Sequence, residues 1–227
     1  MNKIKTKAVI FDYDGTLTYG NYLNIYKSLY HILGYATDKT SKYYQDYLDF
    51  KDYKLSYENW VKINEQDFKN AGLTKNIFES AIENIKLIDE LDVVLKTLHQ
   101  KGIKLYVLSG NFGYAIRKNL GNLTDLFTEI SANEIYFNDD GSVSHMVATK
   151  FDYEGKPNFI KKVQEELNIE PYEICFVGNG ENDKFAYRSG AKTICINPVD
   201  ADEKNAEKWA CVLNNVTSFK KILDCIE

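Results

Sequence analysis

The sequence predicts an α/β protein with a doubly wound parallel sheet into which a helical domain is inserted. Short apolar runs of strand length recur along the chain, and from residue 87 onward they alternate with helical patterns. The apolar run at 8–11 is the first such strand, but residues 19–86 after it show no further strand pattern. A core domain at 1–18 and 87–227, interrupted by a helical cap domain at 19–86, accounts for these observations.

Composition narrows the class of protein before any motif is considered. The chain has 227 residues, of which 44% are hydrophobic and 27% charged, as is typical of a soluble globular protein. The net charge is −5 and no basic cluster occurs, which argues against a nucleic-acid partner. No signal peptide or apolar run of membrane-spanning length is present, so we expect a cytoplasmic protein without a membrane partner. Nothing in the sequence indicates an oligomeric state.

Cysteine usage agrees with a reducing compartment. The four cysteines stand far apart at positions 175, 195, 211 and 225, and no CxxC pair occurs. Cys175 and Cys195 lie inside apolar runs of strand length, so we expect buried, reduced thiols.

The first strand ends in a pair of carboxylates. Asp12 and Asp14 follow the apolar run directly, and Gly15 comes next. Residues i and i+2 of a strand share a face, so both carboxylates can point to one place beyond the strand's carboxyl end. Open α/β sheets bind their ligands there. Two like charges at this spacing repel each other, and we therefore expect a positive group between them.

The inserted segment is predicted to contain about four helices. Helical patterns occur at 40–49, 57–71 and 74–84, with Gly34 and Gly72 as breakers. The first helix is marked by tyrosines three or four residues apart, namely Tyr19, Tyr22, Tyr26 and Tyr30. Such a stripe usually packs in a core. Because it begins five residues after Asp14, however, we also consider an aromatic wall that would favour a ring-bearing or apolar substrate.

The remaining elements follow in α/β order. Helices are predicted at 90–100, 112–120, 158–167, 184–189 and 216–226, and strands at 103–108, 127–130, 173–177 and 193–196, the last being the final strand. Residues 134–147 read as a hairpin around the turn Asn138-Asp139-Asp140-Gly141.

Two loops and one lysine among these elements carry further polar groups. Ser109-Gly110-Asn111 falls between a strand and a helix, where free backbone N–H groups and the helix dipole favour an anion. Gly178-Asn179-Gly180-Glu181-Asn182-Asp183 follows a buried strand. Lys156 lies in a loop, and by itself such a lysine indicates only a solvated surface.

Taken in order, these motifs resemble the haloacid dehalogenase (HAD) superfamily. The shared features are DxDGT after the first strand, Ser-Gly after a later one, an isolated lysine, and a Gly-rich acidic loop. The helical insertion and the hairpin before Lys156 resemble the phosphoserine phosphatase-like branch, whose helical cap (C1 type) follows the first motif. The resemblance spans almost the whole chain and implies a Rossmann-like core and a Mg²⁺-dependent phosphatase acting on a small-molecule phosphomonoester.

The resemblance also implies roles for individual residues. Asp12 would be the nucleophile that forms an aspartyl-phosphate, Asp14 the acid and then the base, and Lys156 the group that neutralises charge. The phosphoryl oxygens would be held by Thr16, Ser109, Gly110, Asn111 and Lys156. The Mg²⁺ ion would be held by Asp12, by the backbone carbonyl of Asp14, and by Asn179 and Asp183.

Two departures from the family pattern affect metal and substrate. The family usually has an aspartate where this chain has Asn179, so we predict weaker Mg²⁺ binding. Phosphoserine phosphatases hold the substrate ammonium with a glutamate where this chain has Asn21, and their caps supply an arginine for the carboxylate. Arg117 and Arg188 are the only arginines here, and neither is in the cap. Phosphoserine is therefore not the expected substrate.

Other functions share these motifs. A dehalogenase also uses an aspartate nucleophile, but it does not need an acid at the position of Asp14. A phosphotransferase or mutase shares the aspartyl-phosphate. A binding protein that has lost turnover is supported only by Asn179.

Overall fold

The computed structural model describes residues 4–19, 24–198 and 208–227. In these residues seven strands form one sheet in the order β4-β3-β2-β1-β5-β6-β7. The strands are β1 (Ala8–Phe11), β2 (Lys104–Phe112), β3 (Glu129–Phe137), β4 (Val143–Val147), β5 (Ile174–Gly178), β6 (Lys192–Ile196) and β7 (Cys211–Leu213). All neighbouring strands are parallel except β3 and β4, which form an antiparallel hairpin. The predicted parallel α/β fold is confirmed.

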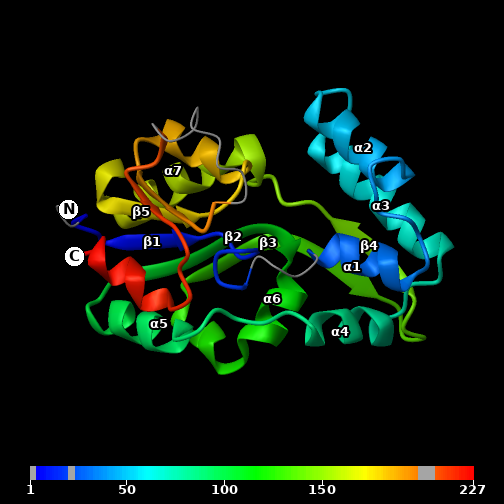
Figure 1. The fold of residues 1–227 in the computed structure, drawn as a ribbon, viewed down its shortest axis with the longest axis horizontal. Helices are drawn as coiled ribbons and strands as arrows, with labels where there is room; N and C mark the ends of the chain where they lie inside the picture. The colour runs from blue at the N-terminus through cyan, green and yellow to red at the C-terminus, as the bar shows by residue number, and fades with distance from the viewer. Residues whose placement is uncertain (1–3, 20–23, 199–207) are drawn as a thin grey trace.

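Helices cover both faces of this sheet. The α-helices of the described residues are α1 (Ile25–Ile32), α2 (Lys42–Lys51), α3 (Tyr57–Asn70), α4 (Lys75–Glu83), α5 (Leu91–Gln100), α6 (Gly113–Leu120) and α7 (Lys156–Leu167). In Figure 1, α7 lies on one side of the sheet and α5 and α6 on the other. Every residue of β1 is fully buried, with Val9 and Phe11 in the cluster that includes α5 and α6 and Ala8 and Ile10 in the cluster of α7. Burial on both faces explains why β1 is continuously apolar.

The four helices expected in the inserted segment lie together at one end of the molecule (Figure 1). Three of them begin at hydroxyl caps: the side chains of Ser41, Ser56 and Thr74 accept hydrogen bonds from the backbone N–H groups of α2, α3 and α4. The helical character of this segment is therefore set by local sequence signals. Its boundaries at 19 and 86 remain a prediction.

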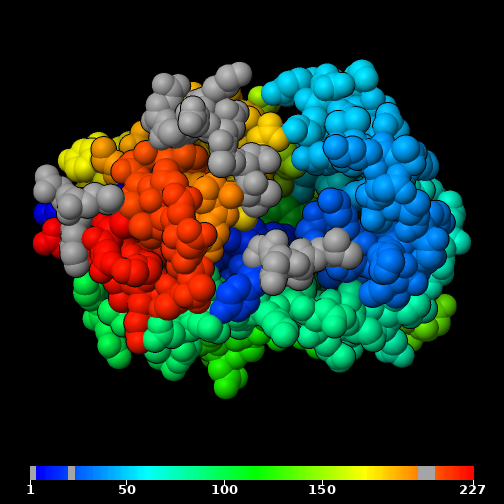
Figure 2. Space-filling view, viewed as in Figure 1, coloured from blue at the N-terminus to red at the C-terminus, as the bar shows by residue number. Residues whose placement is uncertain are grey.

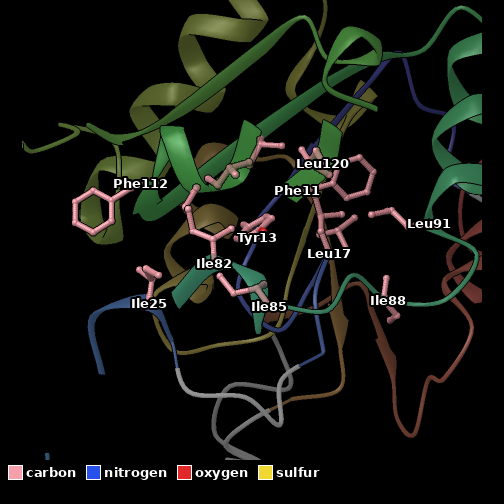
Figure 3. Close-up of a cluster of buried hydrophobic side chains, with 14 of the residues drawn as sticks. Phe11, Tyr13, Leu17, Ile25, Ile82, Ile85, Ile88, Leu91, Phe112 and Leu120 are labelled. Atoms are coloured by element: carbon pink, nitrogen blue, oxygen red, sulfur yellow. The ribbon is translucent and has the colours of Figure 1, made fainter. Parts of the chain in front are cut away.

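These helices share a hydrophobic core with the sheet. In Figure 3, buried side chains form a continuous row from Ile25 and Ile82 past Tyr13 to Phe11 and Leu91. The hairpin of β3 and β4 also contacts the inserted helices, because the Met146 N–H donates to Glu65 of α3 at 2.7 Å. The helical segment is thus anchored through α1, α3 and α4.

The end of the chain differs from the prediction. The strand at 193–196 is not the last, since β7 pairs with β6 beyond it. Instead of an α-helix at 216–226, the structure has a 3₁₀ segment, Phe219–Asp224, and the helix expected at 184–189 is also 3₁₀, Asp183–Ser189. Buried Phe219 and Ile222 are three residues apart, a spacing that a 3₁₀ turn aligns as well as an α-helix does.

Two strands are longer than predicted. β2 continues through the expected turn at 109–111, with a register shift against β3 between Leu108 and Phe112. β3 joins the predicted strand at 127–130 to the first arm of the hairpin. Polar residues within β2 and β3 obscured the continuity of these two strands in the sequence.

Lys156 is not in a loop but is the first residue of α7.

All four cysteines are buried and none forms a disulfide. Cys211 and Cys225, separated by 14 residues, lie with their Sγ atoms 2.9 Å apart. In the described part of the chain, no helix combines the length and apolarity needed to cross a membrane.

Candidate active site

The candidate site lies at the carboxyl ends of β1, β2 and β5. The chain proceeds from β1 to β2 and β3 on one side, then crosses over to β5 on the other side of β1. A crevice opens at such a reversal of strand order, and α/β proteins bind ligands there. Asp12 follows β1, Ser109 lies near the end of β2, and Asn179 follows β5. The structure therefore brings together residues that are up to 167 positions apart in the sequence.

Lys156 occupies the centre of the site. Its side chain is fully buried, and its Nζ lies 2.7 Å from Asp183, 3.4 Å from Asp12 and 3.5 Å from Asp152. Lys156, at the amino-terminal end of α7, thus places a positive charge beside Asp12. The interpretation of Lys156 as a solvated surface residue is wrong.

Burial and the neighbouring charges shift the pKa values of Asp12 and Lys156. Burial raises the pKa of Asp12 well above its ordinary value, and the nearby Asp183 adds to this rise, although Lys156 opposes it. Burial alone would lower the pKa of Lys156, but Asp183, Asp12 and Asp152 outweigh burial and raise it. The surroundings therefore favour the protonated form of Lys156, while burial and Asp183 disfavour the ionised form of Asp12.

The second carboxylate of the motif has a different environment. Asp14 is partly exposed, and its oxygens accept hydrogen bonds from Asn111 Nδ2 at 3.0 and 3.2 Å. The side-chain oxygen of Asn111 accepts from the Phe112 N–H at 2.6 Å, which fixes the direction of the amide group. Asn111 thus positions Asp14, a contact that its sequence position did not reveal.

Hydroxyl groups lie at the same edge of the sheet. Thr16 is fully buried, and its Oγ1 has no hydrogen-bond partner among the described residues. A buried hydroxyl without a partner is costly unless a ligand satisfies it. Ser109 is also buried, and its Oγ accepts from the Asn111 N–H at 3.1 Å. The Asn111 N–H, expected to bind a phosphoryl oxygen, therefore already donates to Ser109 within β2.

The loop after β5 is organised by Asp183. One carboxylate oxygen of Asp183 accepts from the N–H groups of Asn179 and Gly180 at 2.8 and 2.9 Å, and the other faces Lys156. Asp183 is fully buried, and Asn179 is only 7% exposed. The side chain of Asn179 packs directly over Gly15. The two loops that follow β1 and β5 therefore touch at this point.

Replacing Gly15 with alanine should disturb the site through this contact. Gly15 has φ +74°, and a Cβ there would lie 2.1 Å from Asn179 Nδ2. We expect a loss of roughly 2–4 kcal/mol of folding stability, of which ~1–2 reflects the left-handed backbone. Urea denaturation of Gly15→Ala provides the measurement.

Gly34→Ala is the matched control for this prediction. Gly34 has a similar φ of +83°, but a Cβ there meets nothing within 4 Å. Gly34→Ala should therefore lose only the folding stability that comes from the left-handed backbone, ~1–2 kcal/mol. Equal losses in the two variants would contradict a close contact between Gly15 and Asn179.

Asn133 is a buried member of the site that sequence reasoning missed. Its Nδ2 lies within hydrogen-bond distance of the Gly110 carbonyl (2.6 Å), Tyr57 Oη (2.8 Å) and Tyr26 Oη (2.9 Å). Its Oδ1 accepts from the Thr149 N–H at 2.8 Å. Asn133 thus ties the end of β2 to α1 and α3. No sequence signal pointed to it beyond a polar residue within an apolar stretch.

Asp152 is the second residue that sequence reasoning missed. Its side chain is 3% exposed and also accepts from Asn182 Nδ2 at 3.3 Å. The signal that could have found it is its spacing of four residues from Lys156, which places both on one side of a helical turn.

The tyrosine stripe belongs mainly to the core. Tyr26 and Tyr30 are buried among Trp60, Phe68 and Phe112, and Tyr22 lies outside the described residues. Tyr26 does not form part of the expected aromatic wall, because it is buried in the core. A cavity of about 860 Å³ next to Asp152 is lined by Phe50, Tyr57, Tyr153 and Phe185.

Comparison with known proteins agrees with this geometry. The sequence model of the family described as haloacid dehalogenase-like hydrolases matches residues 6–188, which include every residue of the site named above. The chain is a haloacid dehalogenase-like hydrolase. This hydrolase is 28% identical over 189 residues to a Clostridium perfringens (strain 13 / Type A) protein whose name describes it as a pyrophosphatase, PpaX, with 82% of each chain covered.

Solved structures establish the fold of this hydrolase independently. A phospho-aspartyl intermediate analogue of phosphoserine phosphatase superposes with a TM-score of 0.76 and 20% identity, covering 98% of this chain and 100% of the other. A substrate-bound phosphoserine phosphatase gives the same score and identity, with 98% and 99% covered. At this identity the likeness concerns the fold. The predicted family and its phosphoserine phosphatase-like architecture are confirmed.

Proposed function

We propose that this hydrolase cleaves a small-molecule phosphate monoester with Mg²⁺, through a phosphoryl group transferred to Asp12. The observation that carries the proposal is the difference between two carboxylates two residues apart. Asp12 is buried beside Lys156, whereas Asp14 is partly exposed and held by Asn111. A nucleophile and a proton donor require such different surroundings.

The residues divide the reaction between them. Asp12 attacks phosphorus, and the bond to the leaving oxygen breaks as Asp14 donates a proton to that oxygen. Asp14 then takes a proton from the water that releases phosphate from Asp12. Lys156 offsets charge on the phosphoryl group.

Phosphoryl oxygens need hydrogen-bond donors in this site. The Thr16 hydroxyl is buried without a partner, so it is available to donate. We assign the Ser109 hydroxyl and the Gly110 N–H to the same role. For Asn111 we assign the positioning of Asp14 in addition, because its N–H is bonded to Ser109.

The donor set fits Mg²⁺. Three carboxylates, those of Asp12, Asp152 and Asp183, lie within 3.5 Å of a single lysine, which leaves an excess of negative charge before any phosphate binds. In the described residues no three acidic, histidine or cysteine side chains form a metal cage. We therefore infer a mixed set of oxygens from Asp12, the Asp14 carbonyl and Asn179, with waters completing it.

In this proposal, Asp183 holds the loop that follows β5 and carries Asn179. Both of its oxygens are engaged, one by Lys156 and the other by two backbone N–H groups. Its direct ligation of the metal remains a prediction. When bound, Mg²⁺ would supply positive charge for the phosphoryl oxygens and favour the ionised form of Asp12.

Asn179→Asp should lower the Mg²⁺ concentration that the enzyme needs for activity. A carboxylate at this position adds a negative charge to the ligand set, and we expect the Mg²⁺ concentration for half-maximal activity to fall roughly 3- to 30-fold. Asn168→Asp, at the far end of α7 from Lys156, controls for the added charge. An unchanged Mg²⁺ dependence in Asn179→Asp would contradict a ligand role for Asn179. Turnover that appears only in this variant would support the weakened-enzyme alternative.

The test of the proposal is hydrolysis of p-nitrophenyl phosphate over a Mg²⁺ titration, with EDTA to remove the metal. We expect release of inorganic phosphate that requires Mg²⁺. Adding an alcohol acceptor distinguishes a phosphotransferase, which would form a new ester, and 2-chloropropionate distinguishes a dehalogenase, which would release chloride. Chloride release without phosphatase activity would overturn the proposal.

A further inference from the structure

Strand β2 bulges against β3 at the place where the proposed phosphate-binding residues lie. Leu108 of β2 pairs with Ser131 of β3, and the next pair is Phe112 with Asn133. Between these pairs β2 has three residues, 109–111, whereas β3 has one. A bulge leaves backbone groups outside the hydrogen-bond ladder, and those groups need other partners in a protein interior. The backbone assigned to the phosphate therefore depends on support from side chains.

The side chain of Asn133 gives this support. It is fully buried, its Nδ2 donates to the Gly110 carbonyl at 2.6 Å, and its Oδ1 accepts from the Thr149 N–H at 2.8 Å. A carbonyl can only accept and a backbone N–H can only donate, so the two contacts together fix the direction of the amide group. Loss of this side chain would leave both backbone groups without a partner, which is costly.

The contact at Gly110 reaches the reacting residues through a single peptide group. The Gly110 carbonyl and the Asn111 N–H belong to the same planar peptide, so a contact that fixes one also fixes the other. This N–H donates to Ser109 Oγ at 3.1 Å, and Asn111 Nδ2 donates to Asp14 at 3.0 and 3.2 Å. Asn133 is therefore one peptide group away from both the Ser109 hydroxyl and the residue that holds Asp14.

Two tyrosines of the inserted helices share the same nitrogen atom. Tyr57 Oη of α3 lies 2.8 Å from Asn133 Nδ2, and Tyr26 Oη of α1 lies 2.9 Å from it. An amide nitrogen has two hydrogens, so it cannot donate to both tyrosines and to Gly110 at the same time. Without one tyrosine hydroxyl, two acceptors remain for two hydrogens. We therefore expect the loss of a single tyrosine hydroxyl to matter less than the loss of Asn133.

Asn133 lies between the phosphate site and the cavity of about 860 Å³. Tyr57 and Thr149, which both contact Asn133, line this cavity, whereas Asn133 does not. In Figure 2 this face of the molecule is hollowed between the cyan residues of α2 and α3 and the yellow to orange residues of the core. Because Asn133 is buried behind the cavity wall, it can act on a substrate only through its neighbours.

We propose that Asn133 is a positioning residue, which sets the Ser109 hydroxyl and the Asp14 carboxyl through the peptide between Gly110 and Asn111. The inference rests on the proposed phosphatase function for the roles of Ser109 and Asp14. The placement of the peptide by Asn133 does not depend on turnover. A purely structural role would lower folding stability without a selective effect on proton donation, and the test separates these two roles.

The test compares phenyl phosphate with p-nitrophenyl phosphate, two esters of similar shape. Phenolate is the poorer leaving group of the two, so its release depends more on a proton from Asp14. In Asn133→Leu we expect kcat/KM to fall about 100-fold for phenyl phosphate and about tenfold for p-nitrophenyl phosphate. The ratio of the two values should therefore change about tenfold.

Three further variants accompany Asn133→Leu. Asn64→Leu makes the same change at another buried asparagine, whose Nδ2 donates to the Trp60 carbonyl at 2.6 Å, and it should leave the ratio unchanged. Tyr26→Phe removes one of the three acceptors and should change the ratio by less than about threefold. Asn133→Asp keeps the shape and the acceptor for Thr149 but has at most one hydrogen to donate. If Asn133→Leu does not fold, Asn133→Asp should shift the ratio in the same direction.

Amide NMR spectra of these variants separate this inference from the proposed function. Displaced signals of the Asn111 backbone and side-chain amides in Asn133→Leu or Asn133→Asp, but not in Asn64→Leu, would support the positioning role even if the wild type hydrolyses neither ester. Unmoved Asn111 signals would overturn it. With an active wild type, an equal loss of kcat/KM for both esters in the folded Asn133 variants would overturn the inference and leave the proposed function intact. The same change of ratio in Asn64→Leu would also overturn it.

Discussion

Asp12→Asn should reduce turnover of p-nitrophenyl phosphate by roughly 10⁴-fold or more, because an amide cannot form the acyl-phosphate bond that the proposed reaction requires. The fold should survive. Asparagine has nearly the same shape, and Asp12 is a buried carboxyl whose ionised form is disfavoured by burial and by Asp183. Lys156 keeps its 2.7 Å contact with Asp183 in the variant. We therefore expect the free energy of unfolding to change by no more than about 1 kcal/mol.

Asp139→Asn is the control for Asp12→Asn, since it changes the same chemical group at an exposed turn. It should retain wild-type turnover. The measurements are steady-state kinetics at saturating Mg²⁺ and urea denaturation of each variant. Turnover in Asp12→Asn within tenfold of wild type would rule out Asp12 as the nucleophile, provided that the protein remains folded.

Lys156→Met should have the largest effect on stability, a loss of about 3–5 kcal/mol. Lys156 is fully buried and is the single cation within 3.5 Å of Asp12, Asp152 and Asp183 in the described structure. Methionine fills the space but leaves three buried carboxylates without a positive partner. Urea denaturation gives the loss. Turnover should also fall sharply, because phosphoryl charge is no longer offset.

Lys161→Met tests whether this loss comes from the buried network. Lys161 lies on the same helix, but its side chain is 71% exposed, and its contact with Glu165 is 3.8 Å long. We expect a change within about 0.5 kcal/mol. Adding Asp12→Asn to Lys156→Met should recover part of the lost stability by removing one unpaired charge. Equal losses for Lys156→Met and Lys161→Met would contradict the ion network.

The central strands and the acidic motif could be predicted because their signals are local. A strand buried on both faces must be apolar throughout, as β1 and β5 are, and Asp12 and Asn179 stand directly after such runs. The helices α2, α3 and α4 begin at hydroxyl caps, which are also local signals. β7 was missed because three residues at a sheet edge carry too little pattern to be distinguished from a loop.

The sequence alone therefore determined the order of the central elements, the family and the residues that follow β1 and β5, because these depend on near neighbours in the chain. Tertiary structure alone decided the surroundings of those residues. It buried Lys156 among three aspartates, placed Asn133 between Gly110 and two tyrosines, and enclosed a cavity beside Asp152. Such contacts join residues far apart in sequence, and their energies arise from burial and mutual distance, which no local pattern encodes.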